Sequence, residues 1–194
     1  MKYTITFFSY WRIGTGLGGG SKDNILMKDD DNLPVIPGKT LKGLIRDAYN
    51  ELGYKNEIEI FGQKLSDISE PTNKEELEEG KFYFGSAQLP EDIKSMLANN
   101  KSLTKELYDT VTTTRLDKDK QNVDSALVKS EVCIPVTLEA EILLKDKYEM
   151  SDENLRKTEE NLAKALKMLR LIGEKRYRGL GRCKIDINHE NPTS

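Results

Sequence analysis

The stretch EVCIPVTLEAEILLK (residues 131–145) decides the fold when it is read with the segment that follows it, SDENLRKTEENLAKALKMLRLIG (residues 151–173). Apolar and polar residues alternate through the first stretch, which predicts one long strand. The second stretch places apolar residues at helical spacing between Ser151, a capping residue, and Gly173, a terminating one. RCKIDIN (residues 182–188) alternates again, so this part of the chain has the order strand, helix, strand.

The first half of the chain predicts a similar set of elements. KYTITFFS (residues 2–9) alternates and predicts a strand, and KFYFGSAQL (residues 81–89) predicts another. Between them, residues 40–53 have helical spacing, with Thr40 in the position of an N-cap. The complete order is strand, helix, strand, strand, helix, strand, which is the βαββαβ pattern of an α+β, ferredoxin-like fold.

The length of 194 residues predicts a single domain over residues 1–194. Two polar segments, 55–80 and 90–130, do not follow the core pattern and are expected to be insertions in that domain. Within the second, residues 109–128 include a run of three threonines and predict a protruding loop or hairpin. Long insertions in compact domains usually have a function.

Composition excludes some classes of protein. No run of apolar residues is long enough to cross a membrane and no leader-like segment is visible, so we expect a cytoplasmic protein with no membrane partner. Cys133 and Cys183 lie in strand-like runs rather than in a CxxC pattern, which predicts two buried thiols. The net charge is -3, but nucleic-acid binding needs only a local positive field.

Positive charge is concentrated near the C-terminus. Residues 164–184 contain eight lysines and arginines and one acid, Glu174. The loop RYRGLGR within this stretch contains three kinds of residue that suit RNA. Its arginines can bind phosphates in bidentate fashion, and its glycines let the backbone approach a ligand and expose N–H groups. Its tyrosine can stack on a base. A tight turn with solvated arginines is the alternative interpretation. The candidate RNA-binding residues here are Arg176, Tyr177, Arg178, Gly179, Gly181 and Arg182.

The start of the first predicted helix is a second candidate anion site. LPVIPGKTLKGLIR (residues 33–46) places Lys39, Thr40, Lys42 and Arg46 near a helix N-terminus, and we expect this helix start to be the partner of the C-terminal loop in holding RNA. The GKT triplet resembles part of a phosphate-binding P-loop, but the spacing of that motif is absent. An ordinary amphipathic helix remains the alternative interpretation.

Taken together, four segments resemble the RAMP superfamily of CRISPR-associated proteins, and most of all the repeating backbone subunit of type III effector complexes. The segments are LPVIPGKTLKGLIR (33–46), FYFGSAQL (82–89), SALVKSEVCIPVTLEAEI (125–142) and RYRGLGRCKI (176–185). They occur in the order of the family and span nearly the whole chain, which would make residues 1–194 a single RAMP domain.

The resemblance implies a ferredoxin-like, RRM-related core with inserted loops. It implies binding of a guide (CRISPR) RNA and of target RNA, contacts with other CRISPR effector subunits, and self-association along the RNA. It also implies that one inserted hairpin, the thumb, kinks the guide–target duplex, and residues 110–128 are the segment that matches this role.

A catalytic residue is implied by the same resemblance. In GGGSKDNILMKDDDNLPVIPG (residues 18–38), Asp23 matches an aspartate that cleaves target RNA with the assistance of a divalent metal such as Mg²⁺. Lys28 and Asp29 match the basic–acidic pair that follows, whereas Asn24 and Ile25 replace the usual serine and proline. The residues that would hold a metal stay unassigned, since the acidic run 29–31 lacks the spacing of a calcium loop and is read as a solvated turn.

Three hypotheses remain open. The chain is an endoribonuclease subunit that cuts target RNA through Asp23, or an architectural RNA-binding subunit without chemistry, or an interaction module that shares only the fold. The only histidine, His189, lies near the polar C-terminal end, which disfavours a histidine-dependent ribonuclease. In either RNA hypothesis, guides of varied sequence require contacts to the backbone rather than to base edges.

Overall fold

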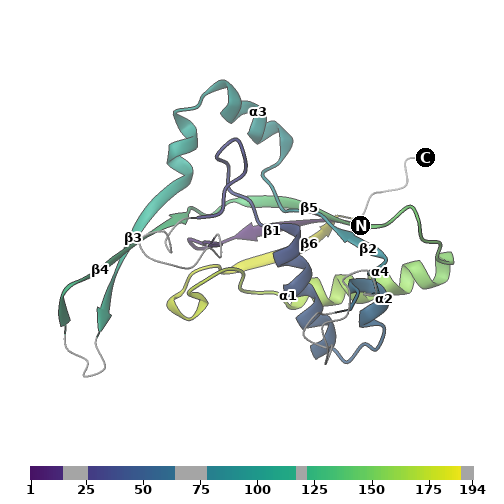
Figure 1. Ribbon diagram of the computed structural model, residues 1–194. Coiled ribbons are helices and arrows are strands. Elements are labelled where there is room, and N and C mark those ends of the chain that lie inside the picture. Colours follow the sequence, from purple (N-terminus) through teal and green to yellow (C-terminus); the bar gives the residue numbers. More distant parts are fainter. Residues whose placement is uncertain (15–25, 64–77, 117–121, 189–194) are drawn as a thin grey trace.

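The computed structural model describes residues 1–14, 26–63, 78–116 and 122–188. Four strands form one sheet, in the order β2 (Phe82–Phe84), β5 (Thr137–Leu144), β1 (Lys2–Phe7), β6 (Cys183–Asn188), and every neighbouring pair is antiparallel. Helix α1 (Gly38–Glu51) follows β1, and helix α4 (Asp152–Met168) joins β5 to β6. The two helices lie on the same side of the sheet (Figure 1). This is the predicted ferredoxin-like βαββαβ core.

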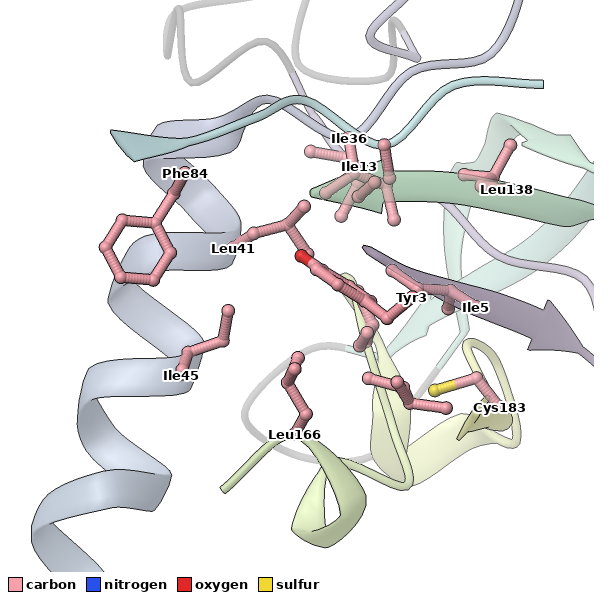
Figure 2. Packing of buried hydrophobic residues seen from close by; sticks show 14 of the residues in the cluster. Tyr3, Ile5, Ile13, Ile36, Leu41, Ile45, Phe84, Leu138, Leu166 and Cys183 are labelled. Carbon is pink, nitrogen blue, oxygen red and sulfur yellow. The ribbon is translucent and has the colours of Figure 1, made fainter. Parts of the chain in front are cut away.

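The core fills the space between the sheet and the two helices. On β1, Tyr3, Ile5 and Phe7 are buried while the residues between them are not, because side chains alternate between the two faces of a strand. Leu41 and Ile45 of α1 and Leu166 of α4 point toward this face (Figure 2). The opposite face of the sheet, called the open face below, carries the remaining residues of each strand.

Helix α1 begins three residues earlier than predicted. Pro37 occupies the N-cap position and Gly38 is the first helical residue, so Thr40 lies inside the first turn rather than capping it. The Gly38 N–H donates to Ser86 Oγ at 3.1 Å, and a Cβ at Gly38 would overlap the Phe84 carbonyl. Only glycine allows the helix to start this close to β2. The predicted end of this helix near Gly53 agrees with the structure.

Helix α4 confirms its predicted cap but ends early. Ser151 Oγ accepts a hydrogen bond from the Asn154 N–H at 3.4 Å. The helix stops at Met168 and Leu169 is extended, so Gly173 does not terminate it. Residues 169–173 instead run back along the sheet, where Leu171 bridges to Arg182.

Two strand predictions were too long. Residues 131–145 do not form one strand, because β4 (Asn122–Cys133) ends before Pro135 and β5 begins at Thr137. Proline has no N–H for a ladder hydrogen bond, and here it separates two strands that belong to different sheets. Similarly, only Phe82–Phe84 of the predicted strand 81–89 is continuous, and Ala87 and Gln88 form isolated bridges.

The predicted hairpin is present. Strand β3 (Tyr108–Leu116) pairs with β4 in a two-stranded antiparallel ribbon that projects from one end of the sheet (Figure 1). It is preceded by α3 (Glu91–Asn99) and a short 3₁₀ helix, η4 (Leu103–Leu107). These elements occupy the predicted insertion 90–130, and β3–β4 covers the thumb-like segment 110–128.

The other predicted insertion, 55–80, contains more structure than expected. Residues 57–61 form a short helix, α2 (Glu57–Phe61), which buries Ile60 and Phe61 in the core. Cys133 and Cys183 are free and buried, and burial raises the pKa of the Cys133 thiol to about 12. Among the described helices, none is both long and apolar enough to cross a membrane.

Candidate RNA interface

The segment between α4 and β6 has a defined and unusual backbone. Residues 176–178 form a short 3₁₀ helix, η5 (Arg176–Arg178), flanked by Lys175 and Gly179 in the left-handed conformation, with φ of 53° and 83°. Gly181 also has a positive φ, 76°. We call residues 174–182 the glycine loop; it lies at the same end of the sheet as the base of the hairpin (Figure 1).

Backbone hydrogen bonds hold this loop against the segment that follows β1. The Gly181 N–H donates to the Tyr10 carbonyl at 2.8 Å, and the Glu174 N–H donates to the Arg12 carbonyl at 3.0 Å. The Gly181 carbonyl in turn accepts from the Ile172 N–H at 2.9 Å. A Cβ at Gly181 would overlap the Ile172 carbonyl oxygen, so this close crossing of the chain requires glycine.

These bonds correct one part of the sequence interpretation. Gly179 and Gly181 were expected to offer their N–H groups to phosphates, but the Gly181 N–H is bonded to Tyr10 and the Gly179 N–H faces the Arg176 carbonyl at 3.2 Å. The glycines therefore shape the loop, and their N–H groups are not available to a phosphate.

The arginine and tyrosine side chains of the loop are exposed. Arg176, Arg178 and Arg182 are exposed, and Tyr177 is 85% exposed. The Arg178 guanidinium lies 5.7 Å from the centroid of the Tyr177 ring, an arrangement in which a flat ring and a cation are presented together. Three guanidinium groups on a fixed backbone can make bidentate contacts to successive phosphates, and the tyrosine can stack on a base.

Glu174, the single acid of the basic stretch 164–184, has a structural role. Glu174 forms an ion pair with Arg12, whose side chain is 1% exposed, at 3.0 Å. The neighbouring Lys175 Nζ donates to the buried Ser130 Oγ of β4 at 2.8 Å. Burial lowers the pKa of Lys175, and the nearby cations of Arg12 and Arg178 lower it further. The carboxylate of Glu174 thus compensates an interior arginine rather than an exposed arginine of the loop.

The hairpin base is fastened to the same segment. The Trp11 and Cys133 backbones exchange two hydrogen bonds, of 3.0 and 2.8 Å, and Trp11 stacks on Phe7 with ring centroids 4.5 Å apart. The Tyr10 hydroxyl donates to Asp109 Oδ2 at 2.9 Å. Residues 10–12 therefore connect the glycine loop to the hairpin, and the two elements are held at a fixed relative position.

The helix-start candidates are placed less favourably. Lys39 is exposed and Thr40 half-buried, whereas partial burial lowers the pKa of Lys42, with Arg46 and Lys145 lowering it further. Arg46 is only 7% exposed: it donates to the Gly62 carbonyl and pairs with Glu57. Arg46 therefore supports α2 from inside the fold, and the structure contradicts its assignment to an RNA-contacting surface.

The helix start and the glycine loop lie at opposite edges of the sheet. Gly38 lies against the end of β2, and the strand register places this point beside Glu141 of β5 and Lys2 of β1. The glycine loop ends where β6 begins, at Cys183, which pairs with Phe7 at the other end of β1. At the usual spacings of a sheet, the helix start and the glycine loop are therefore about 17 Å apart along the strand direction and about 14 Å apart across the strands. The two candidate sites are therefore separate on the sheet, and their joint action on one RNA stays a prediction.

Asp23 lies outside the described residues. The residues flanking that part of the chain, Gly14 and Leu26, bridge to each other, and the Met27 N–H donates to the Ile13 carbonyl at 2.7 Å. Gly14 also lies against the Glu174 carboxylate. The chain thus departs toward Asp23, and returns from it, beside the glycine loop.

The basic–acidic pair after Asp23 is structural. Lys28 pairs with Glu131 at 2.8 Å and lies 3.8 Å from the centroid of the Tyr108 ring, which joins this segment to the hairpin. Asp29 Oδ1 accepts hydrogen bonds from the N–H groups of Asp31 and Leu33, an arrangement typical of a polar turn. In the described part of the chain, no group of three histidines, cysteines or acids is placed to hold a metal.

Sequence reasoning overlooked several residues at this end of the sheet. Arg12, Ser130 and Glu174 brace the loop through contacts between distant segments. Phe8 and Tyr10 expose their rings directly after β1. The run FFSYWR (residues 7–12) is the signal that was available, because it places aromatic residues and an arginine immediately beyond a strand.

Comparisons with known proteins agree with this geometry. The chain matches the RAMP superfamily over residues 4–184, and it therefore belongs to that superfamily. Its fold is similar to that of a chain in the type III-B Cmr-beta complex bound to cognate target RNA, with a TM-score of 0.64, 13% identity and 95% of each chain covered. A chain in the apo state of type III-B Cmr-beta gives 0.59, 14% and the same coverage. No curated protein sequence matches.

Proposed function

We propose that this chain is a guide-RNA-binding subunit of a type III CRISPR effector complex, and that it holds the RNA backbone with the glycine loop. The observation that carries the proposal is the set of three exposed arginines, Arg176, Arg178 and Arg182, on a loop fixed by hydrogen bonds to residues 9–12. Membership of the RAMP superfamily and the likeness to a chain of a complex that binds target RNA support it.

The mode of binding follows from the chemistry of the loop. Arginine side chains on a pre-formed backbone contact phosphates without selecting a sequence, and little side-chain and backbone freedom is lost when the anchor is already rigid. Tyr177 adds a stacking surface that accepts any base. A subunit of this kind can hold guides of any sequence, which is what a guide-dependent complex needs.

The hairpin β3–β4 takes the thumb role in this proposal. It projects from the body of the protein (Figure 1), and its base is fastened to residues 10–12, which also carry the glycine loop. A rigid projection beside an RNA-holding loop would reach along the RNA toward the next subunit. Self-association along the guide and contacts with other effector subunits therefore belong to the same proposal.

Cleavage of target RNA is the finer part of the proposal. RNA supplies its own nucleophile: the 2′-OH attacks the adjacent phosphorus while a carboxylate accepts the hydroxyl proton and the backbone is held in line. The bond from phosphorus to the 5′-oxygen breaks, and that oxygen leaves with a proton from water, which gives a 2′,3′-cyclic phosphate and a 5′-hydroxyl. We assign that role to Asp23, with assistance from Mg²⁺. Because the described residues include no cluster that would hold a metal, we derive no step through the ion. A purely architectural subunit is the alternative.

Salt dependence tests whether RNA is held through its phosphates. If three arginines each neutralise one phosphate of single-stranded RNA, log affinity should fall against log salt with a slope of about -2. A fluorescence-anisotropy titration of a labelled 40-nucleotide RNA at several salt concentrations measures this slope. A slope near zero would instead favour an interaction module that shares only the fold.

A further inference from the structure

We propose that Phe8 and Arg182 form a base-stacking subsite at one end of the open face of the sheet. The inference deepens the proposed RNA binding and rests on it. Phe8 supplies the surface on which an unpaired base stacks, and Arg182 holds the phosphate of the same nucleotide. The subsite extends the RNA path from the glycine loop onto the sheet.

The register of the sheet places these two side chains together. Phe7 pairs with Cys183, and both are buried on the core side. One residue farther, the Phe8 N–H donates to the Arg182 carbonyl at 2.8 Å, so these residues directly oppose each other. Because side chains alternate between faces, Phe8 and Arg182 both lie on the open face. Directly opposed residues have Cβ atoms about 5 Å apart.

The backbone of this pair is fixed at a second point. In a regular antiparallel ladder the Arg182 N–H would return a hydrogen bond to the Phe8 carbonyl. Here it donates to Ser9 Oγ at 2.9 Å, which lets the chain turn away from the sheet immediately after Phe8. The adjoining Gly181 N–H is held by the Tyr10 carbonyl. The stacking ring is therefore presented by a rigid frame that is continuous with the glycine loop.

The exposure of Phe8 is unusual for its strand. The apolar residues of β1 on the core side are almost completely buried, whereas Phe8 is 57% exposed. A single exposed apolar residue is ordinary on protein surfaces. This one, however, lies opposite an exposed arginine. The next pair along the strands presents Lys184, whose ammonium group forms an ion pair with Asp186 at 2.7 Å. A flat ring beside a guanidinium group matches the base and the phosphate of a nucleotide.

Charge confines RNA to this end of the open face. Farther along the strands, Thr4 lies between Glu139 and Asp186, and Lys2 lies between Glu141 and Asn188. Glu139, Glu141 and Asp186 make the middle and the far end of the face more acidic than the Phe8 end, although Asp186 is paired with Lys184, and a polyanion is repelled there. In a typical RRM, by contrast, aromatic residues in the middle of the sheet stack on bases. Among the described residues of the open face, the charge distribution therefore favours RNA at the Phe8 end.

The test replaces Phe8 by alanine and by tryptophan in the full-length protein. For a single-stranded RNA probe, Phe8→Ala should weaken binding about tenfold, as expected for loss of one stacked base, while the salt slope stays that of the parent, because no ionic contact is lost. Phe8→Trp should restore affinity. Tyr83→Ala is the matched control, since Tyr83 is 53% exposed on β2 at the opposite edge of the sheet, and it should bind like the parent.

A second readout separates stacking from other effects. RNA that carries 2-aminopurine should lose fluorescence on binding to the parent and to Phe8→Trp, but less so on binding to Phe8→Ala. Equal affinity and quenching for the parent and Phe8→Ala would overturn the subsite, as would impaired assembly of Phe8→Ala with unchanged RNA affinity. If the parent itself shows no salt-dependent RNA binding, the proposed function fails, which is a different outcome.

Discussion

Replacing Arg176, Arg178 and Arg182 together by alanine should weaken RNA binding about a hundredfold at moderate salt, because three charge-assisted phosphate contacts are lost. All three side chains are exposed, and the hydrogen bonds that fix the loop involve backbone groups and Ser9. The variant should therefore stay folded. Its salt slope should be smaller in magnitude than that of the parent by about 2. Anisotropy titrations measure both quantities.

A charge-matched control distinguishes a site from a general electrostatic effect. Lys55, Arg156 and Lys157 are also exposed, and none belongs to the glycine loop. Their joint replacement by alanine removes the same net charge and should change RNA affinity by less than about threefold, since exposed charges beyond a Debye length are screened. Equal weakening by the two triple variants would show that RNA is not held by the loop.

Replacing Asp23 by alanine is the change with the largest expected effect on activity. In the assembled complex with guide RNA, Mg²⁺ and labelled target RNA, the rate of cleavage should fall at least about a hundredfold, the usual contribution of a positioned general base. Guide binding should remain within about twofold of the parent, because the arginines of the loop are unchanged. Single-turnover cleavage measured on sequencing gels gives the rate.

The neighbouring acidic turn supplies the control for this experiment. Asp30 is exposed and lies in the same acidic run, so Asp30→Ala removes an equal charge and should cleave at the parent rate. If Asp23→Ala cleaves like the parent, Asp23 is not catalytic. If the parent complex leaves target RNA intact under every condition, the architectural alternative is correct and the RNA-binding proposal still stands.

Much of the core could be predicted from the sequence because local patterns determine it. The alternation of Tyr3, Ile5 and Phe7 predicted which face of β1 is buried, and Ser151 predicted the start of α4. The polar segment 109–128 predicted a protruding loop or hairpin, and a hairpin is present. In each case the signal lies within a few residues, and tertiary contacts act in the same direction as local preference.

The incorrect predictions concern features that are determined by contacts between residues far apart in the sequence. Arg46 had the spacing of an exposed helix residue, but its partners Gly62 and Glu57 lie in the segment 55–80, for which the sequence predicted only an insertion. Pro135 divides a run whose alternation continues across it. The N–H of Gly181 was expected to be free, yet the Tyr10 carbonyl comes from the other end of the chain. No local pattern encodes such contacts.

The candidate site was predicted in part for the same reason. The exposed arginines of the glycine loop could be found from composition, because charge density is a local property. The ion pair between Arg12 and Glu174 joins positions far apart in the chain, and only the fold brings them together. The pairing of Phe8 with Arg182 likewise depends on the register between β1 and β6.

The central claim is that this chain holds a guide RNA. The most direct test is to purify the protein from cells that produce it together with its CRISPR array and partner subunits, extract the nucleic acid and size it on a denaturing gel. We expect RNA of one or a few discrete lengths that carries guide sequences, and its loss from the Arg176, Arg178 and Arg182 triple variant. A preparation without RNA, or with a continuous smear of cellular RNA, would contradict the claim.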